Sequence, residues 1–165
     1  MRLHLLRHAK SSWKDESLAD RDRPLAGRGR RAAAAMAEHF AAQGIVPGLV
    51  LCSTAVRTHQ TYARLELGDV PVRYEPGIYG ASADDLLTLL RTVPDTVDTL
   101  LMIGHNPGLE DLALLLARPS AERDDLALKF PTGALATLEL DAGTRWSGLA
   151  PAGATLTAFV RPREL

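Results

Sequence analysis

The chain has 165 residues and a formal net charge of −1, because 19 Lys and Arg nearly balance 20 Asp and Glu. This balance gives no general electrostatic argument for binding nucleic acid or a membrane surface, so any anion site has to be local. Hydrophobic residues make up 46% of the chain and charged residues 24%, as in globular proteins, and the length favours a single domain over residues 1–165.

The cysteine count and the N-terminal sequence bear on the compartment. Cys52 is the only cysteine, so no internal disulfide can form, which fits a reducing compartment. The N-terminus lacks the regions of a secretory signal, and no run approaches the roughly 20 apolar residues that span a bilayer. We therefore expect a cytoplasmic protein.

The first part of the chain predicts a strand, a long loop and a helix. Met1–Leu6 is apolar and is predicted as a buried strand that stops at Arg7. The polar segment Lys10–Arg23 has no useful periodicity and is predicted as a loop over the end of this strand. A helix is expected over Gly27–Gln43, with Gly44 as its stop signal.

Strands and helices continue to alternate in the middle of the chain. Leu49–Cys52 is predicted as a second strand, and Ser53 is expected to cap the helix that follows. Val70–Tyr74 is predicted as a third strand, and a leucine-rich helix is expected to begin at Ser82.

The pattern changes after a fourth strand, Thr99–Ile103, and a helix over Pro107–Ala117 that starts at its proline. The alternation of apolar and polar residues in Ala134–Leu140 and Thr155–Arg161 is typical of antiparallel or edge strands, with Arg145–Leu149 as a candidate to pair between them. Strand-helix alternation followed by a strand cluster predicts one α/β domain with a mixed, mostly parallel sheet.

Two arginines and two histidines follow or lie close to the ends of predicted strands. Arg7 and His8 end the first strand, Arg57 lies four residues beyond Ser53, and His105 follows the fourth strand. Ligands of open α/β sheets bind outside the carboxyl ends of the strands, so we expect these side chains to meet at one edge. Each residue alone is more often structural, and the prediction rests on their conjunction.

The residue types favour transfer of a phosphoryl group. A neutral His8 imidazole could attack phosphorus and carry the group until water releases it. The guanidinium groups of Arg7 and Arg57 match the geometry of phosphate oxygens, and His105 could stabilise their charge. The helix N-termini after Ser53 and Asn106 would add N–H donors, so the predicted phosphate-binding residues include Asn106.

Metal and nucleotide-hydrolysing motifs are absent from the sequence. There is no His-Glu-x-x-His pattern, no cysteine pair, no EF-hand spacing and no P-loop. The sequence therefore predicts an enzyme without a metal or another cofactor.

The chain resembles the histidine phosphatase, or phosphoglycerate mutase-like, superfamily. The resemblance is carried by Arg7-His8, by Ser53, Arg57, Gln60 and Thr61, by Gly104–Pro107 and by Arg23-Pro24-Leu25. The short length and the segment from Arg7 to Trp13 look most like the small phosphohistidine phosphatase branch. The resemblance implies a three-layer α/β/α fold, no metal and a four-residue phosphate pocket. Ala9 replaces the glycine common in the family, and the inserted lid of the mutases is not evident.

The resemblance leaves the general acid open. Larger members place a carboxyl group after the third strand, where Glu75 is the candidate here, and Asp22 in the first loop is a weaker one. An alkoxide leaving group, with a conjugate acid of pKa about 15.7, needs a proton far more than an imidazole at about 6.5. A weak acid therefore favours phosphohistidine in a protein as the substrate.

Two other functions fit the same residues. The first is a small-metabolite phosphomonoesterase, acting on a sugar phosphate or a nucleotide, in which the segment Lys10–Arg23 sets specificity. The second is a catalytically silent phosphate-binding module, against which the presence of a nucleophilic imidazole argues.

Overall fold

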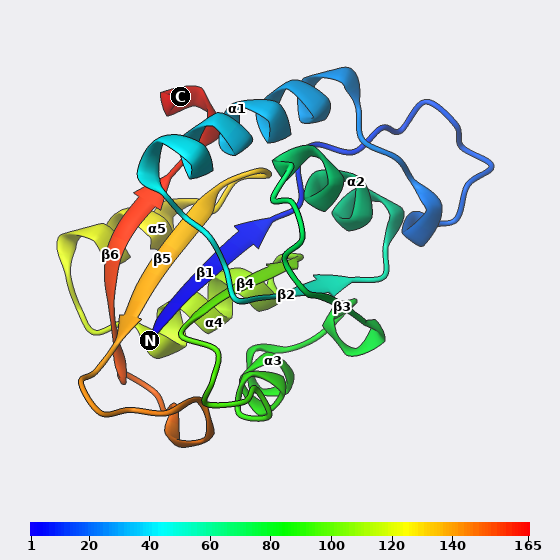
Figure 1. Ribbon diagram of the computed structural model, residues 1–165. Coiled ribbons are helices and arrows are strands. Elements are labelled where there is room, and N and C mark those ends of the chain that lie inside the picture. Colours follow the sequence, from blue (N-terminus) through cyan, green and yellow to red (C-terminus); the bar gives the residue numbers. More distant parts are fainter.

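One mixed sheet runs through the computed structural model, which describes residues 1–165 (Figure 1). Its strand order is β3-β2-β4-β1-β5-β6. The first four strands of the chain are parallel, β5 is antiparallel to β1, and β6 is antiparallel to β5, so the predicted mixed, mostly parallel sheet is confirmed. The strands are β1 (Arg2–Arg7), β2 (Leu49–Ser53), β3 (Val72–Glu75), β4 (Thr99–Gly104), β5 (Leu135–Leu140) and β6 (Ala154–Val160).

Helices cover both faces of the sheet, which confirms the three-layer arrangement (Figure 1). On one face, Met36 and Phe40 pack against Val50 and other sheet residues. On the other face, a larger core of 26 buried residues joins Leu86 and Leu109 to the sheet. The helices are α1 (Gly27–Gln43) and α2 (Val56–Leu65) on the first face, and α3 (Ala83–Leu90), α4 (Gly108–Leu116) and α5 (Ala121–Leu128) on the second.

The longest helix, α1, has the predicted bounds. Gly44 takes a left-handed backbone conformation with φ of 62°, and its N–H donates to the carbonyl groups of Ala41 and Phe40. A residue without a side chain adopts this conformation without strain, so the glycine ends the helix.

The last third of the chain corrects one prediction and adds a helix that was not predicted. Arg145–Leu149 does not pair in the sheet, because β5 and β6 pair directly with each other. Trp146 lies instead in a 3-10 helix, Trp146–Gly148, where it is fully buried and donates its indole N–H to the carbonyl of Val97 at 2.7 Å. Helix α5 was not predicted; only Leu126 of this helix is buried, so its sequence carries no apolar stripe.

Two helices and one strand start one or two residues later than predicted. Ser53 is not the N-cap of α2, because the chain runs on to Ala55 before it turns into the helix, although the Ser53 hydroxyl accepts the Ala55 N–H at 3.3 Å. Pro107 is the N-cap of α4 and not its first residue. The third strand begins at Val72, two residues later than predicted.

The register of the parallel strands positions the site. Arg7 of β1 lies opposite Gly104 of β4, and Cys52 of β2 lies opposite Ile103. The carboxyl ends of β1, β4 and β2 therefore meet side by side at one edge of the sheet. No helix of the structure has the length and apolar character needed to cross a membrane.

Candidate active site

The predicted arginines and histidines lie at this edge of the sheet. His8 follows β1, His105 follows β4, and the centroids of their rings are 5.2 Å apart. Arg57 lies in the first turn of α2, and the charges of Arg7 and Arg57 both act on His8. The topology thus brings together four side chains that are far apart in the sequence.

Hydrogen bonds fix the orientation of the His8 ring. Its Nδ1 lies 2.8 Å from the carbonyl oxygen of Ala9, which can only accept, so Nδ1 carries the proton. The N–H of Ala9 in turn donates to the Thr61 hydroxyl at 3.0 Å. The Nε2 lone pair of His8 is therefore free to act as a nucleophile.

Burial keeps His8 neutral. Only 7% of the residue is exposed. Loss of solvent lowers the pKa of His8 to about 3, and the nearby His105, Arg57 and Arg7 lower it further against the effect of the Ala9 carbonyl. At neutral pH the imidazole carries no proton on Nε2.

His105 is held by the end of the neighbouring strand. Its Nε2 lies 2.7 Å from the hydroxyl of Ser53, which also accepts the Ala55 N–H, and we assign the Ser53 hydroxyl as the donor to Nε2. This assignment leaves the proton on Nδ1, a buried atom without a partner. Burial and then the charge of Arg57 lower the pKa of His105 to about 4, so the ring is neutral and acts as an N–H donor.

Asp20 holds Arg57, a contact that sequence reasoning missed. The Arg57 guanidinium donates to the Asp20 carbonyl at 2.7 Å and to its carboxylate at 2.9 Å. The Tyr79 hydroxyl donates to the same carboxylate at 2.6 Å, and Arg23 donates to it at 3.2 Å. The hydrogen bond from Tyr79, followed by that from Arg57, lowers the pKa of Asp20 to about 2. Asp20 is therefore a carboxylate at neutral pH.

Arg7 shares an acceptor with Asn106. The guanidinium of Arg7 donates to the carbonyl of Phe130 at 2.9 Å, and the Asn106 amide donates to the same carbonyl at 3.0 Å. The Asn106 amide also donates to Glu110 at 3.1 Å. Asn106 thus supports the residues around Arg7, and its role in binding phosphate stays a prediction.

The two candidate acids lie apart from these contacts. Glu75 ends β3 at the edge of the sheet, and its carboxylate accepts two hydrogen bonds from Arg73, at 2.6 and 3.1 Å. Asp22 is exposed in the short 3-10 helix Asp20–Asp22. The acid role of either residue stays a prediction.

Buried polar atoms without hydrogen-bond partners lie on residues in and around the site. They are Nε of Arg7, Nε of Arg57, Nδ1 of His105, Nη1 of Arg23 and Oδ1 of Asn106. Buried polar atoms are nearly always hydrogen-bonded, so the unpaired N–H groups of Arg7, Arg57 and His105 are consistent with a site for an anion with several acceptor oxygens. No three side chains among His, Cys, Asp and Glu gather closely enough in the structure to hold a metal ion.

Comparisons with known proteins agree with this geometry. A family model of the histidine phosphatase superfamily (branch 1) matches residues 3–96, more than half of the chain. The uncharacterized protein Rv1276c of Mycobacterium tuberculosis is 40% identical over 162 residues, which cover 96% of this chain and 100% of that protein. The chain therefore belongs to the histidine phosphatase superfamily, and it is a phosphatase.

Comparison with solved structures shows which members of the superfamily this chain is similar to. A protein of Nakamurella multipartitia, provisionally named as the phosphohistidine phosphatase SixA, is 34% identical with a TM-score of 0.85, covering 98% of this chain and 95% of that one. A protein of Escherichia coli str. K-12 substr. MG1655, provisionally named as an alpha-ribazole-5'-P phosphatase, shares the fold at 18% identity and a TM-score of 0.67, covering 98% of each chain. The predicted likeness to the small phosphohistidine phosphatases is confirmed.

Proposed function

We propose that the protein hydrolyses phosphohistidine in a protein substrate through a phosphohistidine intermediate on its own His8. Nε2 of His8 attacks phosphorus, a P–N bond forms, and the bond from phosphorus to the substrate imidazole breaks. The substrate ring carries a proton on its other nitrogen and so leaves as neutral imidazole. A water molecule then attacks phosphorus, the bond to Nε2 breaks, and phosphate leaves. The neutral, oriented imidazole of His8 supports this role.

The unpaired donors of the site would hold the phosphoryl group during both steps. Nε of Arg7 and Nε of Arg57 would bind its oxygens, and Nδ1–H of His105 would stabilise the charge that develops in the transition state. Asp20 would act through Arg57, whose guanidinium it orients. No step of this sequence calls on a metal ion.

The substrate class rests on one observation: the carboxylate in contact with the site is ionised. The pKa of Asp20 is lowered to about 2, so this carboxylate is not a ready proton donor at neutral pH. A leaving imidazole, with a conjugate-acid pKa of about 6.5, departs without the strong acid that an alkoxide requires. The likeness to SixA proteins supports the same substrate.

The test is phosphate release from a histidine-phosphorylated protein in the presence of a chelator. We expect release by the wild type and none by His8→Ala. His39→Ala is the matched control, because this histidine lies on α1 away from the site, and it should keep wild-type activity. Release that persists in His8→Ala, or that the chelator abolishes, would contradict the mechanism.

A small phosphomonoester is the second candidate. A cavity of about 270 Å³ lies beside His105, between Ser82 before α3 and Gly108 at the start of α4, and it could hold a compact leaving group. Turnover of a sugar phosphate or nucleotide, with none of the phosphoprotein, would favour this function. Turnover of any phosphate ester would exclude a silent binding module. A cytoplasmic location remains part of the proposal.

A further inference from the structure

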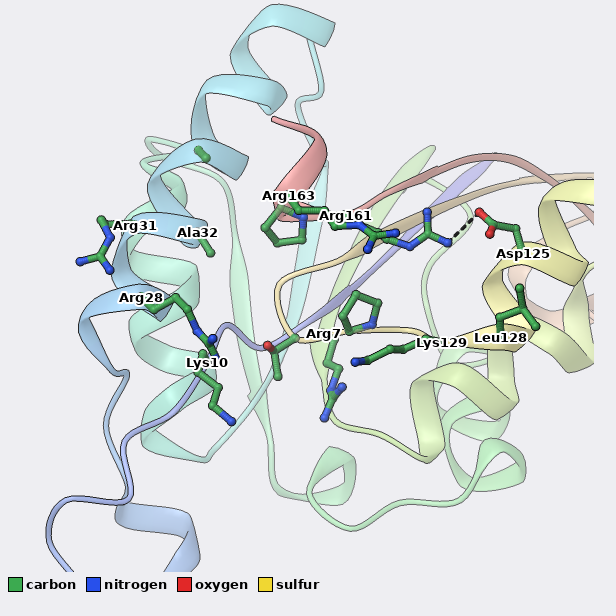
Figure 2. Close-up of a pocket in the computed structure, with 14 residues that line it drawn as sticks. Arg7, Lys10, Arg28, Arg31, Ala32, Asp125, Leu128, Lys129, Arg161 and Arg163 are labelled. Atoms are coloured by element: carbon green, nitrogen blue, oxygen red, sulfur yellow. Dashed lines mark ion pairs between the residues drawn. The ribbon is translucent and has the colours of Figure 1, made fainter.

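A large groove lined by positive charge opens beside the active site. Its volume is about 830 Å³, and seven Lys and Arg side chains line it against the single carboxylate of Asp125 (Figure 2). This basic groove lies between α1, the connection from α5 to β5 and the C-terminal segment after β6. Such an excess is not expected from a chain whose net charge is −1.

Most of these cations have no partner within the chain. Asp125 pairs with Arg161 at 2.7 Å, and Arg161 also pairs with Glu164 at 2.9 Å, so the only carboxylate of the groove is used. The remaining cations apart from Arg7 make neither an ion pair nor a side-chain hydrogen bond; they are Lys10, Arg28, Arg31, Lys129 and Arg163. Clefts lined by one sign of charge concentrate the field and attract ligands of the opposite sign.

The groove is continuous with the catalytic site through Arg7. Arg7 lines the groove and also carries one of the unpaired donors of the phosphate site. Figure 2 shows Arg7, Lys10, Arg28 and Lys129 around one opening, whereas Arg31 points away from it. A ligand in the groove can therefore be part of the same molecule whose phosphoryl group reaches His8.

Close backbone packing fixes one wall of the groove. The Ala26 N–H donates to the carbonyl of Lys10 at 2.8 Å, and a Cβ added to Gly29 would lie only 2.1 Å from that same oxygen. The backbones of Lys10 and of the first turns of α1, which carry Arg28, are thus held together, and this keeps the two side chains on one side of the groove.

The lining favours a polypeptide over a small phosphate ester. Several separated cations match several separated anionic groups, and the lining residues include no aromatic side chain on which a nucleobase could stack. We propose that the basic groove binds an acidic segment that flanks the phosphohistidine of a protein substrate. This inference rests on the proposed function for the identity of the phosphoryl group.

The first experiment compares two phosphohistidine peptides that differ only in their flanks. One carries Asp and Glu beside the phosphohistidine, and the other carries Asn and Gln at the same positions. We expect the wild type to prefer the acidic peptide in kcat/KM by about tenfold, the size expected of a few partly exposed ion pairs. The preference should shrink as salt is added, because salt screens exposed charges.

Variants then assign the preference to the groove. Arg28→Ala combined with Lys129→Ala removes two positive charges from opposite walls, and the kcat/KM ratio of acidic to neutral peptide should fall to near one. Arg64→Glu is the matched control, because it changes the net charge equally from an exposed position on α2 outside the groove. It should keep the wild-type ratio, and equal melting temperatures would show that all the proteins are folded.

A binding measurement separates the groove from the chemistry. A labelled acidic peptide without phosphate should bind the wild type and Arg64→Glu about tenfold more tightly than the double variant, whether or not turnover occurs. If neither phosphopeptide is turned over, the proposed function is wrong. The binding measurement then tests the proposed role of the basic groove by itself. Equal binding of the acidic peptide by all three proteins would contradict the proposed role of the basic groove. Binding of short polyphosphate together with no binding of the acidic peptide would contradict it as well.

Discussion

Asp20 is the residue on which the position of Arg57 depends. Its carboxylate accepts hydrogen bonds from Arg57, Arg23 and Tyr79, which come from three separate parts of the chain. The carboxylate itself is half exposed, so its ion pairs add little to the stability of the fold. Its main effect is to fix the position of the Arg57 guanidinium. The proposed role of Asp20 is to hold this guanidinium in place for a negatively charged substrate.

We expect Asp20→Ala to lower kcat/KM for an aryl phosphate by about tenfold, since a charge-assisted hydrogen bond contributes roughly 1.5–3 kcal/mol and the backbone contact to Arg57 remains. Asp20→Asn, which keeps an acceptor oxygen, should recover part of the loss. Glu16→Ala is the matched control, because Glu16 is an exposed carboxylate in the same loop. Equal losses in Asp20→Ala and Glu16→Ala would contradict the positioning role.

The sequence predicted the meeting of the four cationic and imidazole residues but not their partners. Arg7, His8 and His105 follow parallel strands, and the carboxyl ends of such strands share an edge. Asp20 lies in a polar loop without periodicity, where only the folded path of the chain shows which residue it meets. Glu75 ends the third strand, as the family resemblance requires of the acid. That strand is the edge of the sheet, and its Arg73 binds the Glu75 carboxylate.

At the scale of elements, the contact between α1 and the segment after β1 connects the active site to the groove. A Cβ on Gly29 would lie 2.1 Å from the carbonyl oxygen of Lys10, which is backbone and cannot turn aside. The absence of a side chain at Gly29 is therefore what lets the helix approach the residues that follow His8.

We expect Gly29→Ala to destabilise the protein by about 1–3 kcal/mol, the usual range for overpacking a close contact. Thermal unfolding measures this as a lower melting temperature. Gly27→Ala, two residues earlier in α1, is the control, because a Cβ there would meet only the far ends of arginine side chains, at 3.4 Å or more. A melting temperature for Gly29→Ala as high as that of Gly27→Ala would show that the contact is not tight.

Elements were predictable where apolar patterning and stop signals agreed. The sequence marks α1 by its length and by Gly44, and the structure has the same bounds. Helix α5 and the 3-10 helix at Trp146 escaped prediction for a physical reason: each contributes one main buried side chain, so neither leaves a periodic pattern. Their positions are set by packing against residues distant in sequence.

At the scale of the whole molecule, three buried histidines make stability depend on pH. Burial lowers the pKa of His4 to about 4, that of His8 to about 3 and that of His105 to about 4. In the unfolded chain each ring takes up a proton near pH 6.5, while the folded protein leaves it neutral. The unfolded state therefore binds more protons below pH 6.5, and stability falls as the pH falls from there toward about 4.

The measurement is urea unfolding at pH 7 and at pH 5. We expect the wild type to lose stability between the two, and His8→Asn to lose less, because it carries one fewer histidine that must stay neutral. His39→Asn is the comparison, and its pH dependence should match the wild type. Equal stability of the wild type at both pH values would contradict the burial of neutral imidazoles.

The three unpaired donors at the strand ends have a thermodynamic consequence for the protein at rest. Arg7, Arg57 and His105 each keep a buried N–H without an acceptor, so an oxyanion that satisfies all three binds the folded state and not the unfolded chain. At one hundred times its dissociation constant, such an ion should add about 2.7 kcal/mol to the free energy of unfolding. Phosphate, or a metal oxyanion of similar shape, should raise the melting temperature of the wild type and leave that of Arg57→Ala unchanged. The melting temperature would thus report on whether the proposed phosphate pocket is filled.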